Sequence, residues 1–308
     1  MLDVRRLNVL REVVKGGSFS AAADALYLSQ SAVSQQIATL EREVGLQLLE
    51  RTTAGPKPTA AGGALLEHAD AVLCRLEEAA RELAEIAGLE AGRLRLMSFP
   101  TASARLVTEA MSEFHRRHPQ VELTFSEGEP EDSLPALRRG DIDVAVAFDY
   151  DAISEDFGRD LDAGLIFQEA MRIALPRGHP LAASSEVPVE ALAGEDWLCG
   201  ERPSSCQLVV FETCRQAGFE PTTSFQSDDY EVLKGLIAAG LGVTLLPELA
   251  GDHPGIELRD IVPKPPVRRI WAVTREAASR SPATETMVGI LRRVGDRYPA
   301  QRSLAAAA

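Results

Sequence analysis

Cysteine is scarce in this sequence, and its placement argues against metal binding. Four cysteines occur among 308 residues, no two of them form a C-x-x-C pair, and no histidine lies near them at metal-ligand spacing. The pattern is typical of reduced, partly buried thiols in a large intracellular chain. The sequence therefore predicts no bound metal and no cofactor.

Long apolar runs are missing as well. No stretch approaches the ~20 apolar residues that a membrane-spanning helix needs. Arg5 and Arg6 are not followed by the apolar core of a signal peptide. We therefore expect a cytoplasmic protein without a membrane partner.

Catalytic signatures are also absent. The five histidines lack partners at a recognisable spacing, and neither a Ser-His-Asp set nor a phosphate-binding loop is readable. The sequence predicts that the protein is not an enzyme.

Acidic residues outnumber basic ones in the sequence, but the excess is unevenly distributed along the chain. The net charge is −14, yet residues 1–60 hold seven Lys/Arg and six Asp/Glu, and the remaining residues hold 25 and 40. An acidic body joined to a near-neutral head predicts that only the head meets nucleic-acid phosphates.

The head has the pattern of a helix-turn-helix followed by a wing. Apolar residues at helical spacing predict helices over 4–15, from Ser18, and from Ser29 to Gly45. Ser18 and Ser29 are N-cap residues, and Gly45 is a helix stop. Residues 46–59 are expected to form a small hairpin. A helix of this kind can pack into a domain and still place side chains in a DNA groove.

A long helix is expected to follow. Apolar residues alternate in steps of four and three over three heptads, a spacing that favours pairing with a second helix. The alternative is that the stripe packs on the chain's own C-terminal domain. The predicted dimer seam consists of Leu65, Ala69, Val72, Leu76, Ala79, Leu83 and Ile86.

From residue 93 onwards, strands and helices alternate, which predicts a parallel sheet covered on both faces. Strands are expected near 94–99, 121–125, 142–148 and 165–175, and a later strand at 268–274. Two sheets linked by two crossings would form a hinged cleft. We expect one lobe from about 90–161 and 267–308, and the other from about 162–266.

Several segments together resemble the LysR-type transcriptional regulators, and the resemblance spans nearly the whole chain. It is strongest in the first sixty residues, and the later segments gain weight from their order and spacing. The segments are Ser18–Ala23, Leu28–Glu41, Gly45–Arg51 and Thr59–Gly62, then Phe114–Pro119, Gly140–Ala145, His179–Leu181 and Ala239–Pro247.

The resemblance implies an α/β protein with three parts. These are a winged helix-turn-helix over 1–60, a dimerising linker helix over 61–89, and a two-lobed, periplasmic-binding-protein-like effector domain over 90–308. Family members bind double-stranded promoter DNA as homodimers or homotetramers and respond to a small-molecule co-inducer. RNA polymerase is a further candidate partner, and association with the nucleoid is expected.

The resemblance also assigns the DNA contacts to the start of the third helix, at Gln30, Ser31, Ser34 and Gln35. Glutamine can contact adenine in the major groove, and serine a phosphate or a base edge. Arg51 and Lys57 match phosphate or minor-groove contacts from the wing. Arg51 could instead pair with Glu43 or Glu50. Many relatives carry arginine where this chain has Gln35. The neutral glutamine attracts DNA phosphates less strongly than an arginine would.

Effector contacts are expected where strands end at the cleft. Thr101 and Ser103 could also serve as helix caps, and Arg202 could clamp a carboxylate or be solvated. The expected residues are Thr101, Ser103, Ser126, Gly128, Phe148, Arg202, Ser204, Ser205 and Ser227.

Acidic residues gather on the same strand-end loops, which favours a cationic or neutral effector over a dicarboxylate. The alternative is that they are ordinary solvated loop tips. They are Glu127, Glu129, Glu131, Asp132, Asp149, Asp151, Asp228 and Asp229.

Two other functions compete with this interpretation. Cys206 and Cys214 lie near the position of the sensor pair in peroxide-sensing LysR relatives, so a thiol-redox regulator is one alternative. Residues eight apart on a helix are separated by ~12 Å along its axis, which is too far for a disulfide without unwinding. A solute-binding protein is the other alternative, but it leaves the first ninety residues unexplained.

Overall fold

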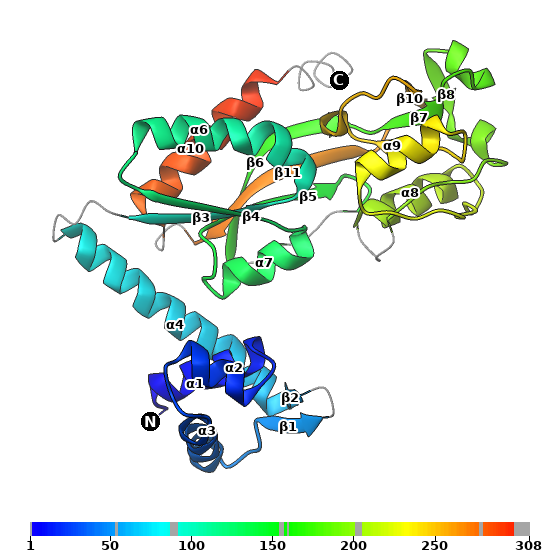
Figure 1. The fold of residues 1–308 in the computed structure, drawn as a ribbon. Coiled ribbons are helices and arrows are strands. Elements are labelled where there is room, and N and C mark those ends of the chain that lie inside the picture. The colour runs from blue at the N-terminus through cyan, green and yellow to red at the C-terminus, as the bar shows by residue number, and fades with distance from the viewer. Residues whose placement is uncertain are drawn as a thin grey trace. The chain divides into compact units, whose positions relative to one another are not determined.

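The computed structural model shows two compact units (Figure 1). The first comprises Met1–Gly92 and Pro135–Asp141, and the second comprises Arg93–Leu134 and Ile142–Ala308. No helix among the described residues is long and apolar enough to cross a bilayer. The structure describes residues 2–52, 55–86, 92–153, 157–158, 160–200, 205–276 and 280–298.

The first unit begins with the three expected helices, α1 (Val4–Lys15), α2 (Phe19–Ala25) and α3 (Gln30–Val44). The Ser18 hydroxyl accepts a hydrogen bond from the Ala21 amide at 3.0 Å, and Ser29 does the same for Ala32 at 3.2 Å. Gly45 ends α3 in the left-handed conformation with φ 72°. Local capping chemistry therefore sets these helix ends, as the sequence predicts.

The wing is an antiparallel pair, β1 (Leu49–Thr52) and β2 (Gly55–Pro58). The Glu41 carboxylate of α3 accepts hydrogen bonds from the amides of Leu48 and Leu49, at 2.8 and 3.3 Å. One carboxylate thus fixes the start of the wing to the third helix.

Helix α4 (Ala60–Ile86) follows the wing and packs against α1. Ala69 is fully buried in the core of the helix-turn-helix, and Leu65 packs against that core. These two positions of the expected dimer seam are therefore already covered within the chain. Val72 and Leu76 are 42% and 51% exposed, and Ala79 is exposed too. The side chains of Leu83 and Ile86 lie outside the described part.

The second unit contains a five-stranded sheet in the order β4-β3-β5-β11-β6. Its strands are β3 (Arg93–Ser98), β4 (Glu122–Glu127), β5 (Val144–Tyr150), β6 (Leu161–Ala170) and β11 (Val267–Arg275). The first three strands run parallel, as predicted, but β11 is antiparallel to both β5 and β6. The sheet is mixed because β11 enters it from the other lobe in the opposite direction.

Helices complete this first lobe. After β3 the chain forms α5 (Pro100–Ala102), a π-helical turn η1 (Ser103–Val107) and α6 (Thr108–Arg117). Helix α7 (Pro130–Arg138) joins β4 to β5 in the chain, and α10 (Pro282–Arg297) is the last described helix. Helices α6 and α10 lie side by side, and α10 also packs on β6 (Figure 1).

The second lobe is built on a four-stranded sheet in the order β8-β10-β7-β9. Helices α8 (Ser205–Gln216) and α9 (Tyr230–Ala238) belong to this lobe, as do the short helices η2 (Pro180–Ala183), η3 (Val189–Leu192) and η4 (Glu248–Ala250). The strands are β7 (Arg172–Pro176), β8 (Glu186–Pro188), β9 (Thr244–Leu246) and β10 (Ile256–Val262).

Two neighbouring segments carry the chain between the lobes. One joins β6 to β7 at Met171, and the other joins β10 to β11, and the Met171 amide donates to the Pro266 carbonyl at 2.8 Å. The single strand expected at 165–175 is thus two strands in different sheets. The crossing falls after Ala170, later than the expected position near residue 161, because β6 pairs with β11 along its length.

Candidate nucleic-acid interface and ligand cavity

The expected DNA-reading residues share one side of α3. Gln30, Ser31 and Gln35 are exposed and Ser34 is half-buried, whereas the alternating apolar positions of the helix lie in the core. Residues four apart on a helix are neighbours, so these four side chains form one polar surface. This surface of Gln30, Ser31, Ser34 and Gln35 is the reading face of α3.

Ser29 hydrogen-bonds to the first turn of α3, where the reading face begins. The Ser29 hydroxyl caps the helix and lies 3.0 Å from the Ser31 hydroxyl. Either hydroxyl can therefore donate to the other, and Ser31 keeps hydrogen-bonding capacity for an external acceptor.

One exposed residue that precedes α3 was not predicted from the sequence. Tyr27, in the turn between α2 and α3, is 96% exposed and has a positive φ of 54°. A positive φ is uncommon for a residue other than glycine. Here it occurs at a residue whose aromatic side chain is almost fully exposed. The apolar pattern of the segment gave no signal for it, because exposure of a turn residue depends on how the helices pack.

The wing offers Lys57, which is exposed on β2. The side chain of Arg51 lies outside the described part of the chain. Glu43, one of the two alternative partners for Arg51, forms an ion pair and hydrogen bond with Arg6 of α1.

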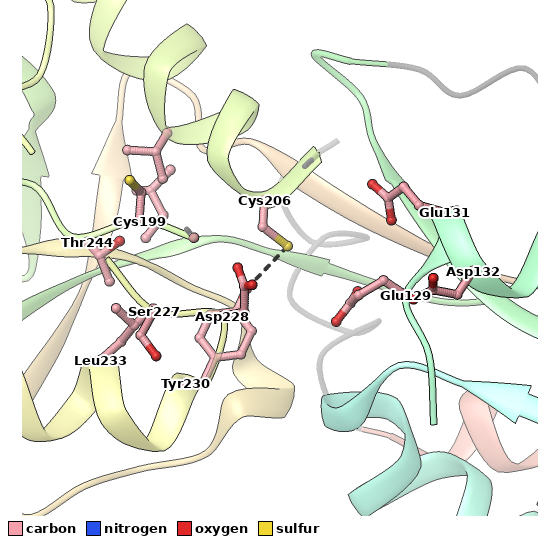
Figure 2. A pocket seen from close by; sticks show the side chains of 13 residues that line it. Glu129, Glu131, Asp132, Cys199, Cys206, Ser227, Asp228, Tyr230, Leu233 and Thr244 are labelled. Carbon is pink, nitrogen blue, oxygen red and sulfur yellow. Dashed lines mark hydrogen bonds between the residues drawn. The ribbon is translucent and has the colours of Figure 1, made fainter. Parts of the chain in front are cut away.

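A cavity of about 150 Å³ lies in the second unit, lined by residues from both lobes (Figure 2). Glu129, Glu131 and Asp132 approach from one side, and α8, α9 and the loop before α9 form the other. The lining consists of Glu129, Glu131, Asp132, Cys199, Gly200, Cys206, Val210, Ser227, Asp228, Tyr230, Leu233, Thr244 and Leu245.

The cavity combines carboxylates with an apolar wall. Four of its lining residues are acidic, Val210, Leu233 and Leu245 are apolar, and no lysine or arginine lines it among the described residues. A wall of this kind attracts a cationic group and can also shelter a neutral one.

Cys206 forms a polar centre in the wall. The hydroxyl of Tyr150 in β5 donates to its sulfur at 3.5 Å, and the hydroxyl of Tyr230 donates at 3.7 Å. Burial raises the pKa of the Cys206 thiol, although the two tyrosine hydrogen bonds oppose that change. Burial likewise raises the pKa of both tyrosines well above the ordinary value. All three groups are therefore neutral near pH 7.

Among the nine expected effector residues, the described lining contains only Ser227. Thr101 is nearly buried and accepts a hydrogen bond from Arg268, and the Ser103 hydroxyl donates to the Phe99 carbonyl at 2.8 Å. Both hydroxyls have hydrogen-bond partners within the protein, and neither residue belongs to the lining of this cavity.

The other expected effector residues also have different positions. Phe148 is buried against Phe99, and Gly128 packs so tightly that a Cβ there would lie 2.8 Å from the Met97 sulfur. Ser126 is exposed at the end of β4, and Ser205 is buried at the start of α8. Arg202 and Ser204 lie outside the described residues.

Of the eight acidic residues expected at the cleft mouth, Glu129, Glu131, Asp132 and Asp228 line the cavity. Three others have structural partners instead. Asp149 accepts hydrogen bonds from Arg269 and from the Trp271 indole. Asp151 accepts one from Lys264, and Asp229 is the N-cap of α9. The eighth residue, Glu127, is exposed on β4.

The thiol pair considered for redox sensing lies on one helix. Cys206 and Cys214 are both within α8, eight residues apart, and all four cysteines are free thiols. Burial, followed by the nearby Glu220 charge, raises the pKa of Cys214 to about 12. A continuous helix keeps the two sulfurs apart, so this geometry does not favour a disulfide switch. Among the described residues, no group of three or more His, Cys, Asp or Glu side chains is placed to hold a metal ion.

A winged helix-turn-helix, a long helix and a two-lobed domain with a cavity define a ligand-responsive, DNA-binding regulator. Two family models match the chain: the bacterial regulatory helix-turn-helix protein of the lysR family over residues 4–63, and the LysR substrate binding domain over residues 87–296. The chain belongs to the LysR family of transcriptional regulators.

Similar proteins agree with this assignment. The transcriptional dual regulator GltC of Bacillus subtilis (strain 168) is 31% identical over 277 residues, which are 89% of this chain and 91% of the relative. The DNA-binding transcriptional dual regulator OxyR of Escherichia coli (strain K12) is 32% identical over 250 residues, 81% of this chain and 80% of the relative. A full-length OxyR variant from Pseudomonas aeruginosa has the same fold, with a TM-score of 0.74 at 23% identity, covering 97% of this chain and 96% of that one.

Membership of this family assigns a DNA-binding helix-turn-helix to the first part of the chain and a substrate-binding domain to the second. The relatives named above are transcriptional regulators.

Proposed function

We propose that residues 1–60 read promoter DNA through the reading face of α3 and that residues 61–89 pair two subunits. Residues 90–308 then bind the effector between their lobes, and the protein acts at the nucleoid without catalysing a reaction. The observation that carries the proposal is the exposure of Gln30, Ser31 and Gln35 on a helix whose opposite side is buried. Lys57 and Arg51 of the wing are assigned to the flanking phosphates.

Alanine substitutions test the reading face. Gln30→Ala and Ser34→Ala should each weaken binding to a specific genomic fragment by about tenfold or more, because a base-edge contact contributes roughly 1–3 kcal/mol. Gln216→Ala, the same change at an exposed residue of α8, is the matched control. Fluorescence anisotropy with labelled fragments measures the affinities, and circular dichroism checks the fold. Unchanged affinity in both variants would refute the assignment.

We further propose that the effector is cationic or neutral. The four carboxylates of the cavity wall support this class, since a dicarboxylate would meet like charge at short range. A thermal-shift panel of primary amines, neutral sugars and dicarboxylates tests it, because a ligand that binds only the folded state raises its stability.

Amines or neutral compounds should raise the melting temperature, and dicarboxylates should not. Glu131→Gln should reduce the shift produced by an amine. Glu127→Gln, at an exposed residue of β4 outside the cavity lining, should leave it unchanged. Stabilisation by dicarboxylates alone would overturn the proposed class.

A further inference from the structure

A buried ion pair lies where the chain crosses between the lobes. Arg268 of β11 and Glu169 of β6 are cross-strand partners, 1% and 0% exposed. The Arg268 Nε and Nη2 atoms donate to Glu169 Oε1 at 2.9 and 2.6 Å. Glu169 is the second-last residue of β6, and Arg268 is the second residue of β11. The pair therefore joins both crossing segments at the same point.

Each residue of the ion pair also forms a hydrogen bond to one of the two lobes. Glu169 Oε2 accepts a hydrogen bond from the Leu249 amide at 2.8 Å, and Leu249 belongs to η4 of the second lobe. Arg268 Nη2 donates to the Thr101 hydroxyl at 3.2 Å, in α5 of the first lobe. The pair thus links η4 to α5, and α5 packs directly against η4.

The surroundings keep water from the pair. The Arg268 guanidinium carbon lies 5.2 Å from the centre of the Phe99 ring and 5.5 Å from that of Phe148. A hydrogen bond to a charged group is stronger than a neutral one when water is excluded. The hydrogen bond that the Leu249 amide donates to Glu169 is therefore of the stronger, charge-assisted kind.

Helix α9 connects this pair to the cavity. Lys234 is almost fully buried, and its Nζ donates to the Ala250 carbonyl of η4 at 2.8 Å. Tyr230, the first residue of α9, lines the cavity and donates to Cys206. The same sulfur accepts from Tyr150 of the first lobe (Figure 2 shows Cys206 and Tyr230). An occupant that displaces Tyr230 thus acts on both lobes at once.

We propose that Glu169 and Arg268 form an interlobe latch that transmits occupancy of the cavity to the angle between the lobes. A shift of Tyr230 moves α9 and Lys234, changes the position of η4, and so makes or breaks the hydrogen bond from Leu249 to Glu169. This inference rests on the proposed effector site. It assigns to Glu169, Arg268 and Thr101 a positioning role, because none of them lines the cavity.

Hydrogen exchange of the full chain tests the latch without DNA or effector. Glu169→Gln should accelerate exchange in peptides covering 246–252 by about tenfold or more, because the Leu249 amide loses a charged acceptor. Glu190→Gln is the matched control, since it is the same change at an exposed residue of η3 in the same lobe and should leave exchange at 246–252 unchanged. Peptides from α10 should exchange as in the wild type, whereas general destabilisation would raise exchange in both regions.

A second variant tests whether the ion pair is coupled to the cavity. Tyr150→Phe removes only the hydroxyl that reaches Cys206 across the lobes, and it should also accelerate exchange at 246–252. The effects of Tyr150→Phe and Glu169→Gln should not add in the double variant, because both act on one two-state element.

Two results would overturn the proposal. One is unchanged exchange at 246–252 in Glu169→Gln, and the other is strictly additive effects in the double variant. Should Glu169→Gln fail to fold, Thr101→Val replaces it, since that change removes one hydroxyl from Arg268 and keeps the side-chain shape. The readout involves neither DNA nor ligand, so a negative result leaves the proposed regulator function intact.

Discussion

Gly295 of α10 lies against the backbone of Ile166 in β6, where a Cβ would stand 1.7 Å from the Ile166 carbonyl oxygen. The neighbour is backbone within a paired strand, so it cannot move aside as a flexible side chain could. Gly295 therefore sets how closely the last described helix approaches the sheet of the first lobe.

Gly295→Ala should destabilise the protein by about 1–3 kcal/mol or more, the usual effect of overpacking. The control lies in the same helix. Gly289 has only the tip of Arg293 near an added Cβ, at 3.7 Å, so Gly289→Ala should be neutral or stabilise by up to about 1 kcal/mol. Urea unfolding measures both. Equal stability of the two variants would show that α10 does not need this close approach.

Acid should weaken a contact at the second crossing segment. Asp151 accepts hydrogen bonds from the Val267 amide and from Lys264 Nζ, each at 2.9 Å. Burial raises its pKa, but these hydrogen bonds and the Lys264 charge outweigh burial and place the pKa below the ordinary value of 3.8. A lowered folded-state pKa stabilises the protein above the unfolded-state pKa, and this stabilisation is lost as the pH falls through the folded-state value.

Asp151→Asn should therefore be less stable than the wild type at pH 7, by about 1 kcal/mol. The difference should shrink from about pH 5 downwards. Melting temperatures of both proteins between pH 7 and pH 3 measure this. A difference that stays constant over the whole range would show that Asp151 titrates as it does in the unfolded chain.

Native thiols should react slowly. The pKa of Cys214 is raised to about 12 and that of Cys206 is also raised, both chiefly by burial, so almost no thiolate is present near pH 7. We expect Ellman's reagent to label the native protein far more slowly than the denatured protein. Peroxide treatment should leave Cys206 and Cys214 unlinked. A peptide mass showing a disulfide between them would instead support the thiol-redox alternative.

The exposed part of the α4 stripe should control assembly. Val72 and Leu76 are apolar and exposed, and burial in a helix pair would remove them from water. Val72→Asp combined with Leu76→Asp should reduce the mass of the particle to that of a smaller assembly in light scattering. Ala71→Asp, at an exposed position outside the stripe, should not. Identical masses for all three proteins would place the subunit contact elsewhere.

Local chemistry made the first unit predictable from its sequence. Ser18, Ser29 and Gly45 set helix ends through contacts within a few residues, and such signals can be read along the chain. The strand expected at 165–175 was wrong for a different reason. Its division at Met171 depends on pairing with β11 on one side and with β9 and β10 on the other, and pairing between distant segments leaves no local mark.

The cavity was only partly predictable. Acidic residues after strand ends suggested its charge, and Glu129, Glu131, Asp132 and Asp228 do line it. Thr101 has the same chemical type as a ligand contact, but it is used by Arg268, 167 residues away in the sequence. The meeting of Cys206 with Tyr150 and Tyr230 also joins segments that only the tertiary fold brings together.

The most direct test of the account is a binding selection with the purified full chain on fragmented genomic DNA in the presence of scrambled competitor. We predict that a small set of fragments is retained at physiological salt and that Gln30→Ala loses this set. Retention of genomic and scrambled DNA alike, with or without candidate effectors, would contradict the claim that α3 reads a specific sequence.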